Sequence, residues 1–322
     1  MKPHLVLIYG YGGHEVEMSY LCESINLRDK NIVVVREEKS RLIDLNGANL
    51  VEDIQISRLR EYYSNSIVGS AFSILKSLST FFYIFRRYRN LTFISTGPGF
   101  SLPFLFGSKT FGFKYLYFEN SCRFHMKSYT GIFCNLLADF MFVQNVESKS
   151  IYPNAIFCGQ LMSKVEKCPT LKKTDVDILV TVGSTLFDEL FDQIDCLPES
   201  IRSRITCQVG PSKKRPNVFN VIDFVDNIED YYSGAQIVIC HAGAGTVFRL
   251  LELDKRIIVV PNISRTDKHQ LDLAQYIEDN NLGHCIKDLS TLEDAISRIE
   301  SLVFDRHKPK KFFMQKYLDS LL

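Results

Sequence analysis

A glycine loop between an apolar run and a helical pattern is the feature that most constrains this chain. The loop, Cys240–Thr246 (CHAGAGT), follows the run Gln236–Ile239 and precedes the pattern Val247–Leu251. This order is typical of a strand, a tight loop and a helix N-terminus, where backbone N–H groups and the helix dipole bind anions. A second glycine run, Gly10–His14, follows the strand-like run Leu5–Ile8. One such loop in each half predicts two α/β domains that face each other across a cleft.

Length and composition agree with a packed protein of two domains. The chain has 322 residues, of which 46% are hydrophobic and 23% charged, as in globular proteins. The net charge of +1 gives no general attraction to nucleic acid. The nine cysteines form no CxxC pair, and Cys134 and Cys240 lie in apolar runs. This usage indicates reduced, buried thiols and a cytoplasmic location.

Membrane contact is expected at the bilayer surface rather than across it. The N-terminus shows no signal-peptide pattern, and the sequence has no run of about 18 apolar residues that would span a membrane. The segment Ile67–Phe85 is rich in Phe, Leu and Ile and ends in Arg86, Arg87 and Arg89. It is either a helix on an anionic membrane surface or a core helix of the first domain. The basic and aromatic tail Arg306–Lys316 is a second candidate contact.

Strand and helix patterns alternate through both halves, which predicts parallel sheets with helices on both faces. A polar stretch is expected between Val35 and Ile67. The expected strands are Leu5–Ile8, Asn31–Val35, Leu91–Ser95, Lys114–Phe118, Phe140–Gln144, Ala155–Cys158, Asp177–Val182, Ile205–Val209, Val218–Phe224, Ile237–Cys240, Ile257–Val260 and His284–Ile286. We expect an N-terminal Rossmann-like domain over 1–160, a linker over 161–176 and a C-terminal Rossmann-like domain over 177–322, whose last helix can pack back on the first domain.

The first loop meets only part of the dinucleotide-binding fingerprint. Gly10 and Gly12 fit its first two positions, but Glu15 stands at the third, where a small residue must pack against the strand. The sharper feature is His14 at the helix N-terminus. The helix dipole lowers the pKa of an imidazole there and favours the neutral form, which is a competent general base. The alternative is a histidine that only caps or orients the loop.

Two loops of the second half carry polar side chains just beyond strands. Thr181–Thr185 follows an apolar run and is either a loop that faces the cleft or a plain β–α turn. Asp267–Gln270 follows the run Ile257–Val260, at the sheet edge where open α/β sheets bind ligands. Its side chains suit sugar hydroxyls, and the alternative is a solvated helix start.

A loop of the first half, Glu119–Arg123, also follows a strand pattern. Its glutamate and arginine can simply pair with each other. Cys122 and His125 make a poor nucleophile pair, because nothing marks that turn as an elbow. No group of His, Cys and Asp residues has convincing metal-ligand spacing.

Four motifs of the second half resemble the catalytic subunit of the two-subunit dolichol-linked N-acetylglucosaminyltransferase. They are TVGSTLFD at 181–188, HAGAG at 241–245, VVPN at 259–262 and HQLDLA at 269–274. The first half is similar to the membrane-anchoring partner subunit, in GYGGH at 10–14, TGPG at 96–99 and ENSCR at 119–123. Bacterial exopolysaccharide and capsule glycosyltransferase pairs carry the same two halves, which here stand in one chain. The peptidoglycan lipid-intermediate N-acetylglucosaminyltransferase is a more distant relative.

The resemblance implies a GT-B fold that binds a UDP-sugar in the C-terminal half. Uracil would rest against 224–228, the diphosphate at 183–184 and 243–246, and the donor sugar at 269–270. The N-terminal half would present the acceptor, usually a sugar on a polyprenyl diphosphate. Catalysis would be inverting and need no metal or other cofactor, because loop N–H groups and the helix dipole offset the charge of the leaving UDP.

The site residues that the resemblance implies fall into three groups, with no metal ligand. His14 is the leading general base, with Glu15, Glu17 and Glu119 as rivals. The donor would meet Gly183, Ser184, Thr185, Phe224, Ile228, His241, Gly243, Ala244, Gly245, Thr246, Arg249, Asp267, His269 and Gln270, and the acceptor side would be formed by Gly12, Gly13, Gly97, Gly99 and Arg123.

Two departures from the family pattern bear on these assignments. Relatives usually carry, four residues after the last glycine of the loop, a glutamate that binds the ribose hydroxyls. This chain has Arg249 there, and arginine accepts no hydrogen bond. Either Glu252 takes over, or Arg249 meets the diphosphate or an acidic donor sugar. The partner subunit's usual N-terminal membrane helix is also missing ahead of Leu5, which leaves Ile67–Arg89 and the tail as candidate contacts.

The sequence therefore predicts a UDP-sugar-dependent glycosyltransferase at the inner face of the cytoplasmic membrane. It would extend a polyprenyl-diphosphate-linked saccharide for capsule, exopolysaccharide or O-antigen synthesis. N-acetylglucosamine is the first choice of donor sugar, with glucuronate, galactose and glucose open. The alternatives are a non-catalytic nucleotide-sugar-binding scaffold and a UDP-sugar epimerase of the same fold. The expected partners are the donor, the lipid-linked acceptor, the membrane surface and either a second copy or assembly proteins, but no nucleic acid.

Overall fold

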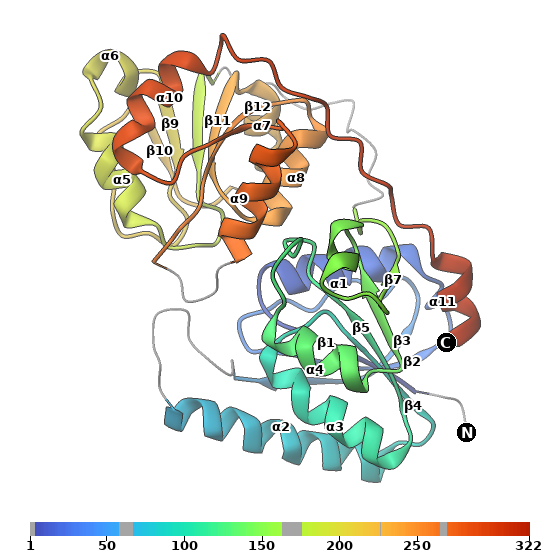
Figure 1. Ribbon diagram of the computed structural model, residues 1–322. Helices are drawn as coiled ribbons and strands as arrows, with labels where there is room; N and C mark the ends of the chain where they lie inside the picture. The colour runs from blue at the N-terminus through green and yellow to red at the C-terminus, as the bar shows by residue number, and fades with distance from the viewer. Residues whose placement is uncertain (1–3, 58–66, 163–175, 226, 265–268) are drawn as a thin grey trace. The chain divides into compact units, whose positions relative to one another are not determined.

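A computed structural model divides the chain into two compact units (Figure 1). Unit 1 is Met1–Glu166 with Pro309–Leu322, and unit 2 is Lys167–Lys308. The structure describes residues 4–57, 67–162, 176–225, 227–264 and 269–322, without the side chains of 67–70. Most of the predicted linker therefore lies outside the described residues.

Unit 1 is built on a parallel sheet with the strand order β3-β2-β1-β4-β5-β6-β7. Its strands are β1 His4–Tyr9, β2 Asn31–Glu37, β3 Asn49–Ile56, β4 Leu91–Ser95, β5 Lys114–Phe118, β6 Phe140–Val143 and β7 Ile156–Phe157. Its helices are α1 Gly13–Ser24, α2 Ile67–Arg87, α3 Leu102–Phe111, α4 Tyr129–Leu137 and α11 Gln315–Leu321, with short 3-10 turns η1 Gly99–Ser101 and η2 Glu147–Ser150.

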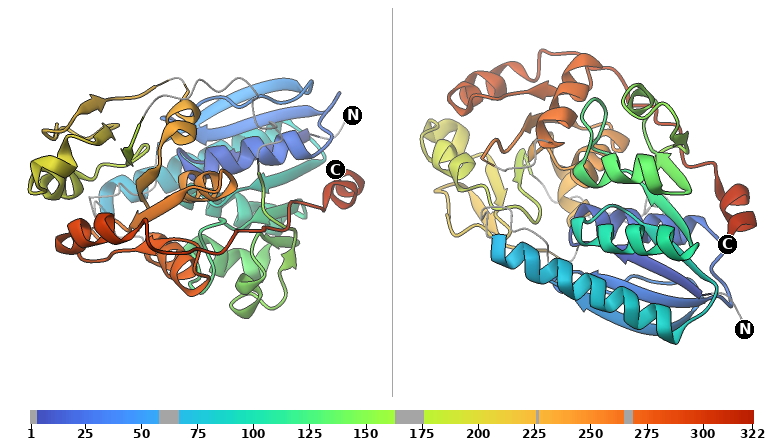
Figure 2. Two further views of the ribbon diagram at one scale, coloured as in Figure 1. Left: turned by 90° about the horizontal axis from the view of Figure 1, so that it is seen from above. Right: turned by 60° about the horizontal axis from the view of Figure 1, so that its bottom comes forward.

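The inner strands of unit 1 are buried on both faces, so alternate residues enter two different cores. In β1, Val6 and Ile8 join a core that includes Phe81 of α2 and Phe104 of α3. Leu5 and Leu7 join the opposite core with Met18 of α1 and Leu318 of α11. Figure 2 shows helices on both faces of this sheet. The sheet is thereby a doubly wound, Rossmann-like layer.

The C-terminal segment of the chain belongs to unit 1. The Gln160 N–H donates to the Lys310 carbonyl at 2.8 Å, and the Phe312 N–H donates to the Gln160 carbonyl at 2.9 Å. Helix α11 then buries Leu318 against the core that also holds α1. The tail Arg306–Lys316 thus continues into a helix that covers the sheet.

The expectation of a polar stretch between Val35 and Ile67 is wrong over Asn49–Ile56, which form strand β3. This strand lies at the sheet edge and pairs in parallel with β2. Most of its side chains are exposed or half-exposed, so an edge strand of this kind needs no apolar run. The physical signal that predicted the other strands is absent from it.

Unit 2 repeats the architecture with the parallel order β10-β9-β8-β11-β12-β13. Its strands are β8 Ile178–Thr181, β9 Ile205–Gln208, β10 Asn220–Ile222, β11 Ile237–His241, β12 Arg256–Val260 and β13 His284–Cys285. Its helices are α5 Asp188–Asp195, α6 Glu199–Arg202, α7 Glu229–Gly234, α8 Ala244–Glu252, α9 His269–Asp279 and α10 Leu292–Arg298, with a 3-10 turn η3 Leu289–Thr291. One core packs Val180 and Ile239 against Phe191 of α5 and Ile296 of α10.

The strand order reverses direction at one point in each sheet. The reversal falls between β1 and β4 in unit 1 and between β8 and β11 in unit 2. Open α/β sheets bind their ligands beyond the carboxyl ends of the strands at this switch point. Both glycine loops singled out in the sequence leave strands that border a switch point.

Among the described residues, no helix combines the length and the apolarity that crossing a bilayer requires. Cys134 and Cys240 are buried with free thiols. Burial also raises the pKa of the Cys22 thiol to about 12, which keeps it protonated and unreactive.

Candidate active site

In unit 1, His14 stands at the switch point between β1 and β4. Gly12, with φ of 79°, caps helix α1, and His14 lies in the first turn of that helix. The Nδ1 atom of His14 lies 2.5 Å from the Thr96 carbonyl oxygen, just beyond β4. A carbonyl can only accept, so Nδ1 carries the proton and Nε2 is the nitrogen with the acceptor lone pair.

Two glycines make the room that the His14 ring occupies. A Cβ on Gly10 would lie 3.4 Å from the ring's Cδ2, and a Cβ on Gly97 would lie 3.5 Å from its Cε1. Gly97 also has φ of +102° and faces the Tyr117 hydroxyl, 3.0 Å from where its Cβ would stand. The TGPG turn, which ends where Gly99 opens η1, therefore serves to hold the imidazole.

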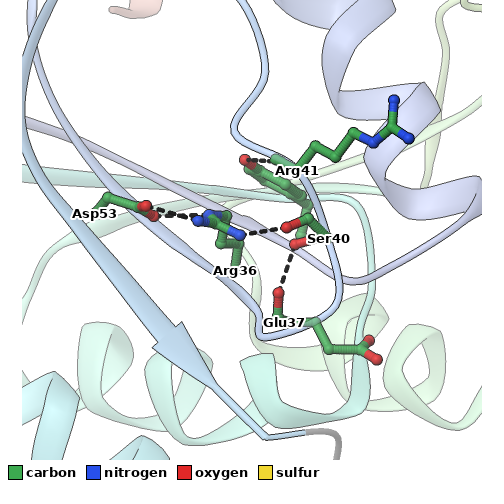
Figure 3. Close-up of polar contacts among 6 residues, drawn as sticks. Arg36, Glu37, Ser40, Arg41 and Asp53 are labelled. Atoms are coloured by element: carbon green, nitrogen blue, oxygen red, sulfur yellow. Dashed lines mark hydrogen bonds and ion pairs between the residues drawn. The ribbon is translucent and has the colours of Figure 1, made fainter.

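Polar contacts beneath the first loop hold it in place. The Glu37 carboxylate, at the end of β2, accepts the Tyr11 N–H at 3.0 Å. Arg36 forms a two-point pair with Asp53 of β3, with both N–O distances 2.8 Å, and also donates to the Ser40 carbonyl (Figure 3). In a dinucleotide-binding fold a carboxylate near the end of β2 reads ribose. Here it braces the glycine loop instead.

Glu15 lies half-buried beside this network. Burial raises the pKa of its carboxyl group, and hydrogen bonding and charge from Arg41 oppose the rise. At the third fingerprint position it thus replaces the small residue that a dinucleotide site requires.

Glu119 is enclosed by donors from within unit 1. It is 2% exposed. One carboxylate oxygen accepts the Tyr117 hydroxyl and the Asn120 N–H, and the other accepts the hydroxyls of Ser128 and Tyr152 at 2.8 and 2.9 Å. This geometry ties the end of β5 to the N-terminus of α4. It suits a structural role better than proton transfer.

Glu17 joins α1 to the same loop from the other side. It accepts the Ser121 N–H at 2.7 Å and the side-chain amides of Asn120 and Gln144. Burial raises the pKa of this carboxyl group to about 7, and the charge of Glu119 adds to the rise. The loop 119–123 is therefore fixed by two buried carboxylates.

Arg123 ends this loop half-buried. Its carbonyl accepts the Ser148 hydroxyl at 2.6 Å. The pairing of Glu119 with Arg123 that the sequence left open is not formed, since the carboxylate is occupied as described above.

In unit 2, His241 packs between two glycine loops at the switch point. It is the last residue of β11 and is buried. A Cβ on Gly243 would lie 2.3 Å from its Nε2, and a Cβ on Gly183 would lie 3.1 Å from its Cε1. The Gly183 N–H in turn donates to the Gln208 side chain at 3.2 Å. The loop after β8 and the loop after β11 are thus packed onto one ring.

Helix α8 begins directly beyond this ring. Gly243 is its N-cap, and Ala244, Gly245 and Thr246 form its first turn. The N–H groups of a first turn have no partner inside the helix, and they carry the positive end of its dipole. A Cβ on Gly245 would meet no atom within 4 Å. Gly245 is exposed, so the first turn of α8 is open on the side to which this residue points.

Arg249, the departure from the family pattern, is held by two carboxylates. Its Nε lies 2.8 and 2.9 Å from the two Glu229 oxygens, its Nη2 lies 2.7 Å from Glu229, and its Nη1 lies 2.8 Å from Glu252. These bonds raise the pKa of the guanidinium, Glu229 contributing most. All three nitrogens donate to carboxylates, and the group of three residues carries a net negative charge. It does not suit a diphosphate or an acidic sugar.

The remaining donor-side residues also lie in unit 2. Phe224 is 63% exposed, and Ile228 caps α7. The Gln270 side chain is buried and accepts the Asn262 N–H at 2.8 Å. His269 begins α9. Asp267 lies outside the described residues.

The structure therefore groups most of the sequence-predicted residues at the two switch points. Thr96, Glu37 and Glu229 are close to these sites and were not predicted. Each is a polar residue at or beyond a strand or helix end, but its partner lies far away in sequence. The described residues contain no group of His, Cys, Asp and Glu side chains that could hold a metal ion.

Comparisons with known proteins agree with this geometry. Residues 177–316 match the glycosyltransferase family 28 C-terminal domain, and residues 5–161 match the family described as oligosaccharide biosynthesis protein Alg14 like. A UDP-N-acetylglucosamine–N-acetylmuramyl-(pentapeptide) pyrophosphoryl-undecaprenol N-acetylglucosamine transferase of Thermosipho melanesiensis is 25% identical over 271 residues, which cover 82% of this chain and 80% of the relative. The human UDP-N-acetylglucosamine transferase subunit ALG13 is 31% identical over 123 residues, 34% of this chain and 11% of the relative.

Solved structures share the fold. MurG of Acinetobacter baumannii aligns with a TM-score of 0.62 at 16% identity, over 93% of this chain and 91% of that one. The UDP-GlcNAc 2-epimerase of Methanocaldococcus jannaschii, solved with UDP-GlcNAc and UDP, aligns with a TM-score of 0.67 at 12% identity, over 99% and 98%.

The two Rossmann-like units thus define a protein of the GT-B class. Residues 177–316 are thus similar to the C-terminal domain of family 28 glycosyltransferases and residues 5–161 to the Alg14-like family, and the chain is a glycosyltransferase.

Proposed function

We propose that this enzyme transfers a sugar, N-acetylglucosamine first, from its UDP donor to a saccharide on a polyprenyl diphosphate, for a bacterial surface polysaccharide. The observation that carries the proposal is the pair of switch points: an oriented imidazole in unit 1 and an open helix N-terminus in unit 2. The names of the relatives support the donor and the lipid-linked type of acceptor. The two matched families are consistent with one chain that combines what the two-subunit enzyme divides.

The proposed mechanism is a single inverting displacement. Nε2 of His14 takes the proton of the acceptor hydroxyl while that oxygen attacks the anomeric carbon. The bond from this carbon to the UDP oxygen breaks, and UDP leaves with the electron pair. The first-turn N–H groups of α8 stabilise the negative charge of the diphosphate. In this mechanism the N-terminus of α8 stabilises the leaving-group charge that other enzymes neutralise with a metal ion.

A transfer assay on the purified chain tests this function. It pairs UDP-N-acetylglucosamine, UDP-glucose, UDP-galactose and UDP-glucuronate with a polyprenyl-diphosphate-linked N-acetylglucosamine, with and without EDTA. We expect EDTA-resistant transfer with inverted anomeric configuration from one donor, and a loss of about 10²–10⁴ in kcat for His14→Ala. UDP binding without transfer would favour a scaffold protein. Conversion of the UDP-sugar without acceptor would favour an epimerase.

The membrane side of the proposal rests on helix α2, which exposes apolar side chains although it also contributes to the core. Its buried stripe contains Phe81 and Ile84 but also the polar residues Ser73, Ser77 and Thr80. Phe72 and Leu75 point outward and are each 64% exposed. The Ser73 hydroxyl donates to the Ser57 carbonyl, and the Ser77 hydroxyl donates to the Ser73 carbonyl. A soluble helix normally turns its apolar side inward. The sequence allowed either a helix on a membrane surface or a core helix. Helix α2 has a buried stripe, as a core helix does, and an exposed apolar stripe, as a membrane-surface helix does.

Helices α3 and α4 extend this apolar surface. Helix α3 packs beside α2 and α4 packs beside α3, on one face of the unit 1 sheet (Figure 1). The Phe82 and Phe111 rings are 6.2 Å apart, and the Phe106 and Phe133 rings are 5.9 Å apart. The exposed apolar side chains are Phe72, Ile74, Leu75, Leu78, Phe82 and Tyr83 on α2, Phe106 and Phe111 on α3, and Tyr129, Ile132, Phe133 and Leu136 on α4. Arg86, Arg87 and Arg89 lie exposed at one end.

An anionic bilayer fits both features of this surface. Apolar side chains enter the interface, and arginines at the end meet lipid headgroups. We expect vesicle flotation to weaken for Phe72→Glu/Leu75→Glu and for Arg86→Glu/Arg87→Glu/Arg89→Glu. Val303→Glu in unit 2, at a still more exposed apolar position, serves as the control and should float as the wild type. Unchanged flotation of both test variants would exclude this surface.

A further inference from the structure

Thr96 and His14 form a reciprocal pair of hydrogen bonds. The Thr96 hydroxyl donates to the His14 backbone carbonyl at 2.9 Å, and the Thr96 carbonyl receives Nδ1–H of the His14 ring at 2.5 Å. Thr96 is fully buried. One residue therefore contacts both the backbone and the ring of the histidine.

The backbone of Thr96 is itself held by the sheet. Its N–H donates to the Ile8 carbonyl at 3.2 Å, which continues the pairing of β4 with β1 one residue past the strand. Its carbonyl is therefore aimed by the sheet rather than by a loose turn. The ring lies close against the backbone of Gly10 and Gly97, where an added Cβ would stand 3.4 and 3.5 Å from ring carbons.

We propose that Thr96 is a positioning residue that fixes the tautomer and the direction of the His14 imidazole. This inference rests on the proposed function, in which His14 takes the acceptor proton. With Nδ1 bonded to a carbonyl, the proton acceptor of the neutral ring is Nε2. When Nε2 gains the acceptor's proton, the Nδ1–H bond to the carbonyl remains and the ring keeps its direction. The hydroxyl of Thr96 adds the second point of attachment.

Three variants separate positioning from folding. Thr96→Val keeps the shape and removes the hydroxyl, and Thr96→Ser restores it. Thr92→Val makes the same change on β4, where Thr92 contributes a half-buried side chain. We expect kcat to fall by about tenfold to a hundredfold in Thr96→Val with KM for both substrates unchanged, as for a misaligned group. Thr96→Ser and Thr92→Val should stay within about twofold of the wild type, the range of a change that leaves this alignment intact.

A second readout does not depend on activity. Nitrogen-15 NMR of histidine-labelled protein reports which ring nitrogen of His14 carries the proton, with His14→Gln used to assign the signal. We expect the Nδ1–H form in the wild type, in Thr96→Ser and in Thr96→Val, because all three keep the backbone carbonyl that receives Nδ1–H, whereas the hydroxyl bonds only the His14 backbone.

The outcomes separate the two proposals. An unchanged kcat in Thr96→Val, or an Nε2–H form in the wild type, would overturn the role of Thr96. Equal losses in Thr96→Val and Thr92→Val would also overturn it. If the Nδ1–H form is found as expected but the wild type transfers no sugar, the proposed function fails and the assignment of the tautomer to the Thr96 carbonyl stands.

Discussion

The buried carboxyl group of Glu17 should make the stability of the chain depend on pH in a defined window. Its pKa is about 7 in the folded chain against an ordinary value of 4.5. Between these values the native state keeps a proton that the unfolded chain releases. The contribution of this group to the free energy of unfolding is therefore complete below pH 4.5 and is lost as the pH rises through 7.

The size of the effect follows from the shift. At 1.36 kcal/mol per pKa unit, the rise from 4.5 to about 7 corresponds to about 3 kcal/mol. Glu17→Gln keeps an uncharged group whose oxygen can still accept the Ser121 N–H. We therefore expect the variant to gain about 3 kcal/mol over the wild type between about pH 4.5 and pH 8, with little difference at the acidic end.

Urea unfolding followed by far-ultraviolet circular dichroism measures this difference, since the chain contains no tryptophan. Subtracting the two proteins at each pH cancels the other titrating groups. Hydrogen exchange of α1 peptides assigns the change to unit 1. The reasoning would be refuted if the free energies of unfolding of Glu17→Gln and the wild type differed by the same amount at every pH. It would also be refuted if the variant lost stability relative to the wild type as the pH rises.

Two further predictions concern unit 2. Gly245→Asp should weaken UDP binding at least about tenfold by calorimetry, because a carboxylate at the open first turn of α8 competes with the diphosphate, while Gly245→Ala should bind as the wild type. Equal binding by both variants would place the diphosphate elsewhere. Gly243→Asp would not test this site cleanly, since its side chain would collide with His241. Because Arg249 is occupied by Glu229 and Glu252, Arg249→Gln should change the affinities for UDP-N-acetylglucosamine and UDP-glucuronate by the same factor. A selective loss of UDP-glucuronate would show that Arg249 reads an acidic sugar.

The fold could be predicted largely from sequence because most strands are buried on both faces. Leu5–Ile8 and Ile257–Val260 are continuous apolar runs, and a glycine loop follows the first of them, which marks strand and turn together. Strand β3 has no such run, because edge strands are partly solvated. Because β3 was not predicted, its residue Asp53, which pairs with Arg36 of β2, was not predicted either.

In the candidate site, too, residues with a local sequence signal could be predicted and their distant partners could not. His14 and the HAGAG loop were predicted, since glycines and an imidazole at a helix start are local signals. The partners of these residues were not. Glu229 pairs with Arg249 across 20 positions, and the contact of Thr96 with His14 spans 82. For Glu119 the sequence and the structure point to different roles: its position after a strand suggests catalysis, and its burial among hydroxyl donors favours a structural role.

Each unit has an imidazole packed between glycines at the switch point of its sheet. The two rings come from opposite sides of that switch point. In unit 1 the ring comes from the helix after the first central strand, β1, and a carbonyl beyond β4 holds its Nδ1. In unit 2 the ring ends β11, the counterpart of β4, and packs under the loops at Gly183 and Gly243. In the proposed mechanism, the first arrangement directs a ring nitrogen with a fixed tautomer, as proton transfer requires. The second uses the ring to support the loops and leaves the backbone N–H groups of α8 to meet the leaving diphosphate. Under that proposal the same architecture supplies a base in one unit and an anion site in the other.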